Sequence, residues 1–514
     1  MDATSRGWDP GSSRAPRRSL RHYLLCGLVT AAGMHATGQV HAAACEREVT
    51  ANVVAFDQPL MFNRLGAQNI NGMMYALQRD VIVKGATAVG GALTAGNVEL
   101  RPDKRPRPLV LRVRVGDCLT VNLTNLLAPA ANPNKDPQPV GTPPFNLIVD
   151  GQVKSRHVGF TASGMQAVNS VKDIGIAAGK NTVADTLAAV GETKTYKLYA
   201  EKEGVFLVQS YGATMGGDAN QGNAGNGLFG QVIVEPRGAK IYRSILTEEE
   251  MRLAADANLN GVLDANEKTA TGQPKINYEA TYPAGGVWAA EGKAGLPIIN
   301  TMTASNEIVH SELEAMMVGP EPDGKFPPST YPLESQGKRN PSVPNRLEPF
   351  RDFAQVWHDE PNTAQAFPGF YNDPVFGYVL AGVKDGFMIN FGSGGIGSEI
   401  IANRLGVGPM HDCLSCAYEE FFLTSYTVGD PAQLVDIPAN VGLEACDPAT
   451  AAAGGAACAA VGPKATAALY PADPINVHHS YIGDFVKFRN THVGKEQHVF
   501  HLHNHQWLYN PNDD

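Results

Sequence analysis

The chain has 514 residues, of which 43% are hydrophobic and 18% charged, and its formal net charge is −10 at pH 7. At roughly 100–200 residues per domain, this length allows about three domains. The 54 Gly and 35 Pro describe a turn-rich globular protein, which excludes a disordered or coiled-coil chain. The negative charge disfavours a phosphate backbone as partner, so we expect no nucleic-acid ligand.

The N-terminal segment has the order of an export signal. Basic residues from Arg14 to Arg21 precede a mildly apolar run, and small residues at 42–44 suit a cleavage site. The pair Arg17-Arg18 resembles a twin-arginine signal. The apolar run is too short to span a bilayer. We therefore expect residues 1–44 to be a signal peptide and the protein to be periplasmic or extracellular, without a transmembrane anchor. An amphipathic N-terminal arm is the alternative.

Loss of residues 1–44 would leave six cysteines, an even number that suits an oxidising compartment. Cys446 and Cys458 flank an Ala/Gly tract and are candidates for a loop-closing disulfide. Cys413 and Cys416 are expected to form a tight disulfide, with a redox pair or half of a metal site as alternatives. His411, two residues before Cys413, keeps the metal alternative open.

From residue 51 to residue 236, short β-branched runs separated by Gly, Pro and Asn predict strands joined by turns. In the run Leu109–Asp117, apolar residues alternate with Arg112 and Arg114, which predicts a strand with one buried face and one face in water. A Gly-Asp turn followed by an apolar-biased strand recurs at Tyr481–Asn490. The recurrence predicts tandem β-sandwiches, with coincidence in a β-rich chain as the alternative.

Thr247 and Glu250 predict the capped start of a short helix over residues 248–255. The twelve residues that follow have the oxygen donors and the central glycine of a calcium-binding EF-hand loop. The segment after the loop is a poor amphipathic helix, so a merely polar turn is the alternative. The predicted calcium ligands are Asp256, Asn258, Asn260, Val262 at loop position 7, Asp264 and Glu267.

The glycine pattern from Gly392 to Gly397 matches a dinucleotide-binding fingerprint. The strands and long helices that should alternate around such a motif are missing from the sequence pattern, so a Gly-rich loop is favoured over a nicotinamide site. An Ala/Gly/Pro-rich stretch over residues 448–468 predicts a linker.

Four histidines, His498, His501, His503 and His505, lie within eight positions near the end of the sequence. On a strand, the imidazoles of the last three leave the same face. Such a row suits two neighbouring metal ions, and neutral imidazole favours copper, zinc, iron or nickel. A His-rich surface strand is the alternative.

This segment resembles the His-x-x-His-x-His motif of multicopper oxidases, here preceded by the Gly-Asp strand that this family also uses. Tyr196–Phe206 is similar to the first-domain strand that leads to a copper motif in this family, and Gly227–Pro236 is similar to the strand that closes that domain. Three further segments resemble the large bacterial, manganese-oxidase-like branch, so that the resemblance covers essentially the whole chain after residue 44: Leu347–Phe353, Met388–Asn390 and Tyr418–Leu423.

The resemblance implies an all-β protein of tandem cupredoxin-like Greek-key sandwiches, with a third sandwich incomplete. It implies that His498 is a ligand of the type 1 copper and that His501 and His503 are ligands of the type 2/type 3 cluster. His505 has no ligand role in the family and stays a weaker metal candidate. The implied reaction is a one-electron oxidation of a metal ion such as Mn(II), or of an organic reductant, coupled to reduction of dioxygen to water.

The sequence departs from the family at three places. Where the first sandwich should carry two His-x-His motifs, it has Thr161-Ala-Ser163 and Gln209-Ser-Tyr211. Hydroxyl and amide groups are poor copper ligands, so we expect no copper there; His157 is a local substitute that we weigh below hydrogen-bonded packing. The family's His-Cys-His motif is absent from the 514 residues, so we expect an N-terminal portion that is inactive alone and needs downstream domains or another chain to complete the copper cluster.

The sequence therefore predicts a copper-binding oxidoreductase of the multicopper-oxidase type, with dioxygen and a small reductant as partners. A non-catalytic, exported copper-binding or scaffold protein is the alternative from another class. The predicted organisation is a signal peptide at 1–44, a first sandwich at 45–240, a connector at 241–295 with the calcium loop at 256–267, a second sandwich at 296–440, a linker at 441–470 and the start of a third sandwich at 471–514.

Overall fold

The computed structural model describes part of the chain, beginning at residue 44. The predicted signal peptide, all four cysteines from 413 to 458, the glycine pattern at 392–397 and the predicted linker lie outside the described residues. The described residues are 44–61, 67–69, 72–104, 106–129, 156–176, 186–212, 223–244, 246, 248–268, 270, 274–331, 347–359, 364–365, 388–390, 478, 485–494, 497 and 499–500.

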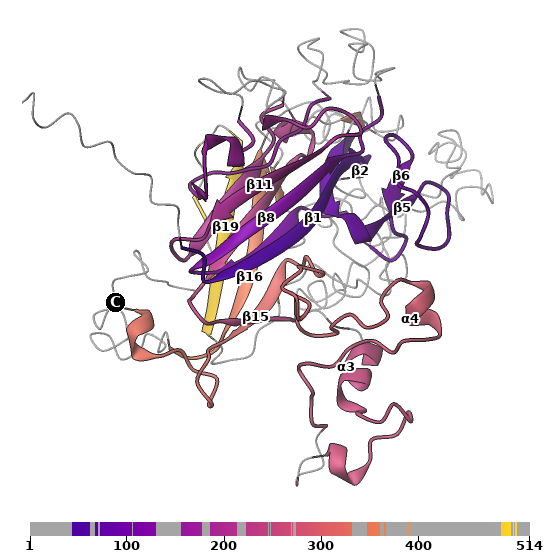
Figure 1. The fold of residues 1–514 in the computed structure, drawn as a ribbon, viewed down its shortest axis with the longest axis vertical. Coiled ribbons are helices and arrows are strands. Elements are labelled where there is room, and N and C mark those ends of the chain that lie inside the picture. Colours follow the sequence, from indigo (N-terminus) through magenta and orange to yellow (C-terminus); the bar gives the residue numbers. More distant parts are fainter. Residues whose placement is uncertain are drawn as a thin grey trace, which may run out of the picture. The chain divides into compact units, whose positions relative to one another are not determined.

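Two sheets pack face to face and form the first sandwich, because their strands alternate apolar and polar residues. Leu111, Val113, Val121, Leu198 and Val232 are all completely buried or nearly so in the core between the sheets. The first sheet has the order β10(Gln166–Ala167), β11(Thr193–Tyr199), β8(Asp117–Asn125), β1(Arg47–Asp57), β4(Met73–Leu77), and the second has the order β7(Leu109–Arg114), β13(Phe229–Glu235), β12(Gly204–Gln209), β9(Thr161–Ala162) (Figure 1).

A third sheet follows in the chain. It contains β19, the strand predicted from the second Gly-Asp turn, which lies parallel to β16. In the first sheet, β8 after the first Gly-Asp turn lies parallel to β1 in the same way. In both places, the strand that follows the Gly-Asp turn thus forms a parallel pair with its neighbour. The strands of the third sheet are β14(Lys240–Arg243), β15(Glu314–Val318), β16(Phe350–Asp359), β18(Met388–Asn390) and β19(Phe485–Val493).

Small elements complete the described part. The predicted helix at 248–255 is observed as α3(Glu248–Ala255), and a second short helix is α4(Val287–Ala290). The predicted all-β fold class is therefore confirmed for the described residues, which form a two-sheet sandwich and a third sheet. Two minor sheets are formed by β17(Ala364–Gln365), β3(Ala67–Asn69) and β2(Leu60–Met61), and by β5(Val81–Val83) and β6(Val98–Leu100); the 3-10 turns are η2(Gln78–Asp80), η3(Val171–Asp173), η4(Ala224–Asn226), η5(Ala265–Glu267) and η6(Pro328–Thr330).

Cys45 and Cys118 form a disulfide that joins the start of the described chain to β8. The sequence predicted an oxidising compartment without predicting this pair. No helix among the residues that the structure describes is both long and apolar enough to cross a membrane.

The second sheet is covered on both faces, which corrects the prediction for the strand at Leu109–Asp117. Arg112 in β7 is only 4% exposed and does not face water. Its side chain lies between the second and third sheets, since the third sheet packs on the face that the alternation pattern assigned to solvent. A buried guanidinium needs ion-pair partners to offset the loss of water.

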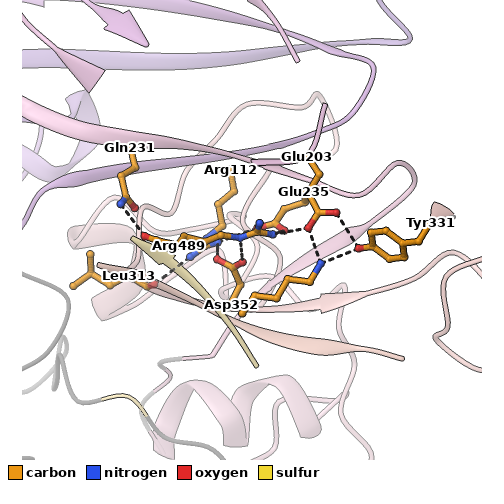
Figure 2. A network of polar contacts seen from close by, with 9 residues as sticks. Arg112, Glu203, Gln231, Glu235, Leu313, Tyr331, Asp352 and Arg489 are labelled. Atoms are coloured by element: carbon orange, nitrogen blue, oxygen red, sulfur yellow. Dashed lines mark hydrogen bonds and ion pairs between the residues drawn. The ribbon is translucent and has the colours of Figure 1, made fainter. Parts of the chain in front are cut away.

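Those partners come from both sheets (Figure 2). Arg112 Nη1 lies 3.0 Å from Glu235 Oε1 on β13 and also pairs with Asp352 on β16. Arg489 on β19 reaches the same two carboxylates, at 2.5 Å from Asp352 Oδ2 and 3.0 Å from Glu235 Oε2. Arg112 Nη2 further donates to the carbonyl of Leu313 at 3.1 Å. Two guanidinium groups and two carboxylates thus link four strands, β7, β13, β16 and β19, across the sheet interface.

A second group of charges extends this network toward solvent. Glu203, which directly precedes β12, accepts hydrogen bonds from Lys487 Nζ at 2.6 Å and Arg489 Nη2 at 3.0 Å. The hydroxyl of Tyr331 donates to Glu203 at 2.9 Å, and Lys487 Nζ lies 3.9 Å from the ring centroid of Phe350. We call Arg112, Glu203, Glu235, Asp352, Lys487 and Arg489 the interface charge network.

Removing one charge from this network should destabilise the protein strongly. In Asp352→Asn, both Arg112 and Arg489 lose a buried ionic partner. Breaking a buried ion pair on one side costs about 3–5 kcal/mol, so we expect the free energy of unfolding in urea to fall by that amount. Lys325→Ala, which removes an exposed pair with Glu348, is the matched control and should leave it unchanged. A loss for Asp352→Asn no larger than the loss for the control would contradict this account.

Candidate functional site

The predicted copper ligands His498, His501, His503 and His505 lie outside the described residues. The structure does describe β19, the strand that leads to them, and Phe500 within the segment. The contacts of β19 and Phe500 are therefore the structural information on this end of the chain.

Phe500 packs on the face of the third sheet that points away from the first sandwich. Its ring centroid lies 6.2 Å from that of Trp357 on β16 and 5.6 Å from that of Phe488 on β19. Trp357 is itself held by a hydrogen bond from Nε1 to Asn490 Oδ1 at 3.4 Å. The chain between His498 and His501 thus lies beside the ends of β16 and β19.

The opposite face of β19 is fixed to the first sandwich by Gln231 on β13. Its Nε2 lies 2.8 Å from the carbonyl of Gln355, 3.0 Å from the carbonyl of Arg489 and 2.7 Å from Thr491 Oγ1. Gln231 is completely buried. The amide group of Gln231 therefore hydrogen-bonds to the backbone of two neighbouring strands, β16 and β19. Together with the interface charge network, these hydrogen bonds fix the position of β19.

The two degenerate motifs of the first sandwich meet at this end of the interface. Thr161 on β9 pairs with Gln209 on β12 in antiparallel register, so their side chains share one face of the second sheet. Gln209 in turn pairs with Phe229, whose ring lies 5.3 Å from that of His358 on the third sheet. Segments separated in the sequence are thus brought to the positions where the family resemblance implies a metal site.

The side chains at these positions do not fit a copper ion. Thr161 and Gln209 are 4% and 8% exposed and offer a hydroxyl and an amide, whereas copper sites in proteins use imidazole or thiolate groups. Ser210 Oγ accepts hydrogen bonds from the backbone of Gly159 at 3.2 Å and Gly212 at 3.3 Å, which is a structural role. His157, weighed as a local substitute, is exposed.

Two histidines that the sequence reasoning did not select lie at the end of the third sheet. His358 is 1% exposed and faces the second sheet, where it contacts Phe229. His492 on β19 pairs with Trp357 and is half-buried. Their only sequence signal is an isolated histidine in a β-strand, which does not distinguish a ligand from a packed side chain.

The predicted calcium loop is brought together by its own hydrogen bonds. The carboxylate of Asp256 accepts from the backbone of Asn260 at 3.1 Å and of Gly261 at 2.7 Å. Glu267 accepts from the backbone of Asn258 at 3.2 Å and of Asp264 at 2.9 Å, which joins the two ends of the loop. Gly261 has a φ of 83°, a conformation that favours glycine at the sharp turn.

Burial of the loop ends is uneven. Asp256 and Glu267 are 1% and 7% exposed, while the middle of the loop is exposed. Asn258 Nδ2 donates to Asp264 Oδ2 at 2.8 Å, and Asn260 Oδ1 accepts from the backbone of Val262 at 2.7 Å. These contacts hold the loop together, but the carboxylate oxygens of Asp256, Asp264 and Glu267 do not all lie within 4.8 Å of one another, so the three acidic side chains do not surround one point.

The interface charge network shifts the pKa of its acidic groups in opposite directions. Burial and the neighbouring Asp352 raise the pKa of Glu235 to about 7, against the lowering effect of Arg489 and Arg112. Burial also acts to raise the pKa of Glu203, but Lys487 and Arg489 outweigh it and lower the pKa to about 2. The same two guanidinium groups that contact Glu235 lower the pKa of Asp352 despite its burial.

No family model matches the chain, and no curated protein matches it. Among solved structures, it is similar to a multi-copper oxidase from Pseudomonas thermotolerans, with 16% identity, a TM-score of 0.20 and coverage of 37% of this chain and 30% of the other. A copper nitrite reductase from Nitrosomonas europaea shows 17% identity, a TM-score of 0.19 and coverage of 37% and 42%. A laccase mutant from B. aclada shows 14% identity, a TM-score of 0.19 and coverage of 37% and 23%. The matched region spans less than half the length of each of these structures.

The pKa shift of Glu235 predicts a specific pH dependence of stability. Between pH 4.5 and about 7 the folded state keeps a proton that the unfolded state has released, so this group makes the free energy of unfolding fall as the pH rises through that range. Glu235→Gln removes this titration. We expect urea unfolding at pH 5, 6, 7 and 8 to show a decline for the wild type that is smaller for the variant.

Glu203 acts in a different range, which provides a control. Its lowered pKa stabilises the folded state above pH 4.5, and this contribution is lost as the pH falls toward 2. Glu203→Gln should therefore change the acid side of the profile. Because the charge of Glu203 helps to raise the pKa of Glu235, this variant should reduce the decline between pH 5 and 7 less than Glu235→Gln does. Equal slopes for the wild type and Glu235→Gln over that interval would contradict the assignment.

Proposed function

We propose that this protein is an exported copper-binding oxidoreductase of the multicopper-oxidase type, in which His498, His501 and His503 hold copper and the first sandwich supports them without binding copper itself. The observation that supports this proposal is the packing of Phe500, which lies between His498 and His501 in the sequence. Phe500 packs against Trp357 and Phe488, next to a strand that is hydrogen-bonded and ion-paired to the first sandwich.

The protein's own residues would act by positioning. Gln231 and Arg489 hold β19 in register, and the aromatic contact of Phe500 orders the segment in which the histidines alternate. Alternating imidazoles on one face suit two neighbouring metal ions. Bound copper would supply one-electron transfer, and a set of several ions suits dioxygen because its reduction to water takes four electrons.

For the substrate we propose a class: a metal ion such as Mn(II), Fe(II) or Cu(I), or a phenolic reductant, with dioxygen as electron acceptor. The Cys45–Cys118 disulfide supports an oxidising, exported location, because disulfides persist in the periplasm and outside the cell.

The rival proposal is a copper-binding scaffold that uses the same histidines without turnover. Thr161 and Gln209 favour it to the extent that the first sandwich offers no copper ligands at these positions. The two proposals differ in oxygen consumption and not in copper content, so both quantities have to be measured on one preparation.

Replacing His501 and His503 together by Ala should lower the copper content of the exported, copper-loaded chain, measured by plasma mass spectrometry, by at least one ion per chain relative to the wild type. His157→Ala is the matched control, and we expect its copper content to equal that of the wild type. Oxygen uptake with Mn(II) or a phenol, measured together with the further domains or second chain that complete the copper cluster, then separates the oxidase from the scaffold. Unchanged copper in the double variant, or copper loss in the control, would refute the proposed ligands.

We further propose that the loop 256–267 binds calcium. Support comes from the ligand spacing in the sequence and from the nearly buried carboxylates of Asp256 and Glu267, which accept backbone hydrogen bonds from the loop. Isolated loops of this kind in extracellular proteins have dissociation constants of about 10⁻⁴–10⁻³ M. This site is independent of the copper site.

Calcium at about 100 times its dissociation constant should stabilise the folded state by about 2.7 kcal/mol. We therefore expect 10 mM calcium to raise the melting temperature of the wild type by several degrees and a chelator to reverse this. Glu267→Gln should abolish the shift, while Glu249→Gln on the adjacent helix, where the side chain is exposed, should retain it. A shift of equal size in Glu267→Gln, or none in the wild type, would show that the loop is a polar turn.

A further inference from the structure

A cavity of about 730 Å³ opens beside the edge of the first sandwich, away from the sheet interface. One side is formed by the end of β4, η2, β5 and the loop 89–93. The other side is formed by Glu291 and Gly292, which follow α4, and by Glu307 and Ile308. The volume lies within the range of about 300–1,000 Å³ found for small-molecule sites.

Much of the cavity wall is apolar. Leu77, Val81, Ile82 and Ile308 form its base and are 1%, 4%, 3% and 2% exposed. The apolar surface open to a ligand comes from Val89, Ala92 and Leu93, which are half-buried or exposed, and Leu93 packs on the core cluster that contains Val81. An apolar wall favours the hydrocarbon part of a ligand, since its burial there removes apolar surface from water.

Most charged groups that line the cavity are already engaged within the protein. Arg101 forms two hydrogen bonds with Asp103, each 2.9 Å long, and a third with the carbonyl of Glu291 at 2.9 Å. The carboxylate of Glu291 lies 2.8 Å from Lys293 Nζ, and that of Glu307 accepts from Asn52 Nδ2 at 2.9 Å. Because of these contacts, Arg101, Glu291 and Glu307 have little hydrogen-bonding capacity left for a ligand.

Arg79 is the exception. Within the described residues its guanidinium makes one long hydrogen bond, 3.3 Å to the carbonyl of Gly292, and no carboxylate lies within ion-pair distance. Burial lowers the pKa of Arg79 below its ordinary value, although Asp80 acts to raise it. A partly desolvated cation beside an apolar wall is stabilised by an anion that brings its own apolar body.

We propose that this cavity binds a small organic acid, with its carboxylate on the Arg79 guanidinium and its hydrocarbon part against Val89 and Leu93. A guanidinium binds a carboxylate through two parallel hydrogen bonds, which fixes the orientation of the ligand. The site is distinct from the proposed copper and calcium sites. It predicts selectivity for ligands that combine one negative charge with a compact apolar group.

Calorimetric titration of the full chain, without added copper, with phenylacetate tests this proposal. We expect saturable binding of phenylacetate and at least tenfold weaker binding of phenylacetamide, which has the same shape without the charge, since a hydrogen bond to a charged group contributes about 1.5–3 kcal/mol. Arg79→Gln should weaken phenylacetate binding at least tenfold.

Two further variants separate binding from folding. Arg237→Gln removes an exposed arginine paired with Glu46, outside the cavity lining, and should bind phenylacetate as the wild type does. Ala92→Trp places a large side chain at the exposed rim and should abolish binding while Arg79 is retained. Absence of binding to the wild type, equal affinity for phenylacetamide, equal affinity in Arg79→Gln or undiminished binding in Ala92→Trp would each overturn the proposal.

Discussion

Three cations and three carboxylates share the interface between the second and third sheets, and burial makes each dependent on the others. Arg489 contacts Asp352 within the third sheet and Glu235 and Glu203 of the first sandwich, so a single side chain on β19 joins the third sheet to the first sandwich at two points. Ions removed from water are tolerated in a protein interior when they are paired. The network therefore fixes one register of β19 against β16 and β13, because a shift by one residue would separate these charges.

At two positions where the family resemblance implies imidazoles, the first sandwich carries a hydroxyl and an amide, which are poor copper ligands. Thr161 and Gln209 pair across β9 and β12. Gly159, Gly212 and Asn223 hydrogen-bond to Ser210, while the buried hydroxyl of Thr161 has no hydrogen-bond partner among the described residues. In the proposed function, the first sandwich supports β19 and the segment after it.

The connector between the first sandwich and the third sheet has its own structural constraints. Glu250 on α3 contacts Arg243 and the hydroxyl of Tyr282 in a buried cluster, so the residue assigned by sequence to a helix cap also serves in packing. The calcium loop begins one residue after this helix ends. Residues 291 and 292 reach back to the first sandwich through Arg101 and Arg79 and close one side of the cavity. The connector is thus an integral part of the described fold.

Local sequence pattern determined the elements. Alternating apolar residues gave the strands, the Gly-Asp turns gave β8 and β19, and the spacing from Asp256 to Glu267 gave the loop, because each of these depends on neighbours within a few residues. Tertiary structure decided which polar residues are buried. Arg112 has the pattern of a water-facing residue, and only the third sheet, formed by residues far along the chain, excludes water from it. The same holds for the Cys45–Cys118 pair, the contact of Thr161 with Gln209 and the isolation of Arg79, since each depends on which segments the fold brings together.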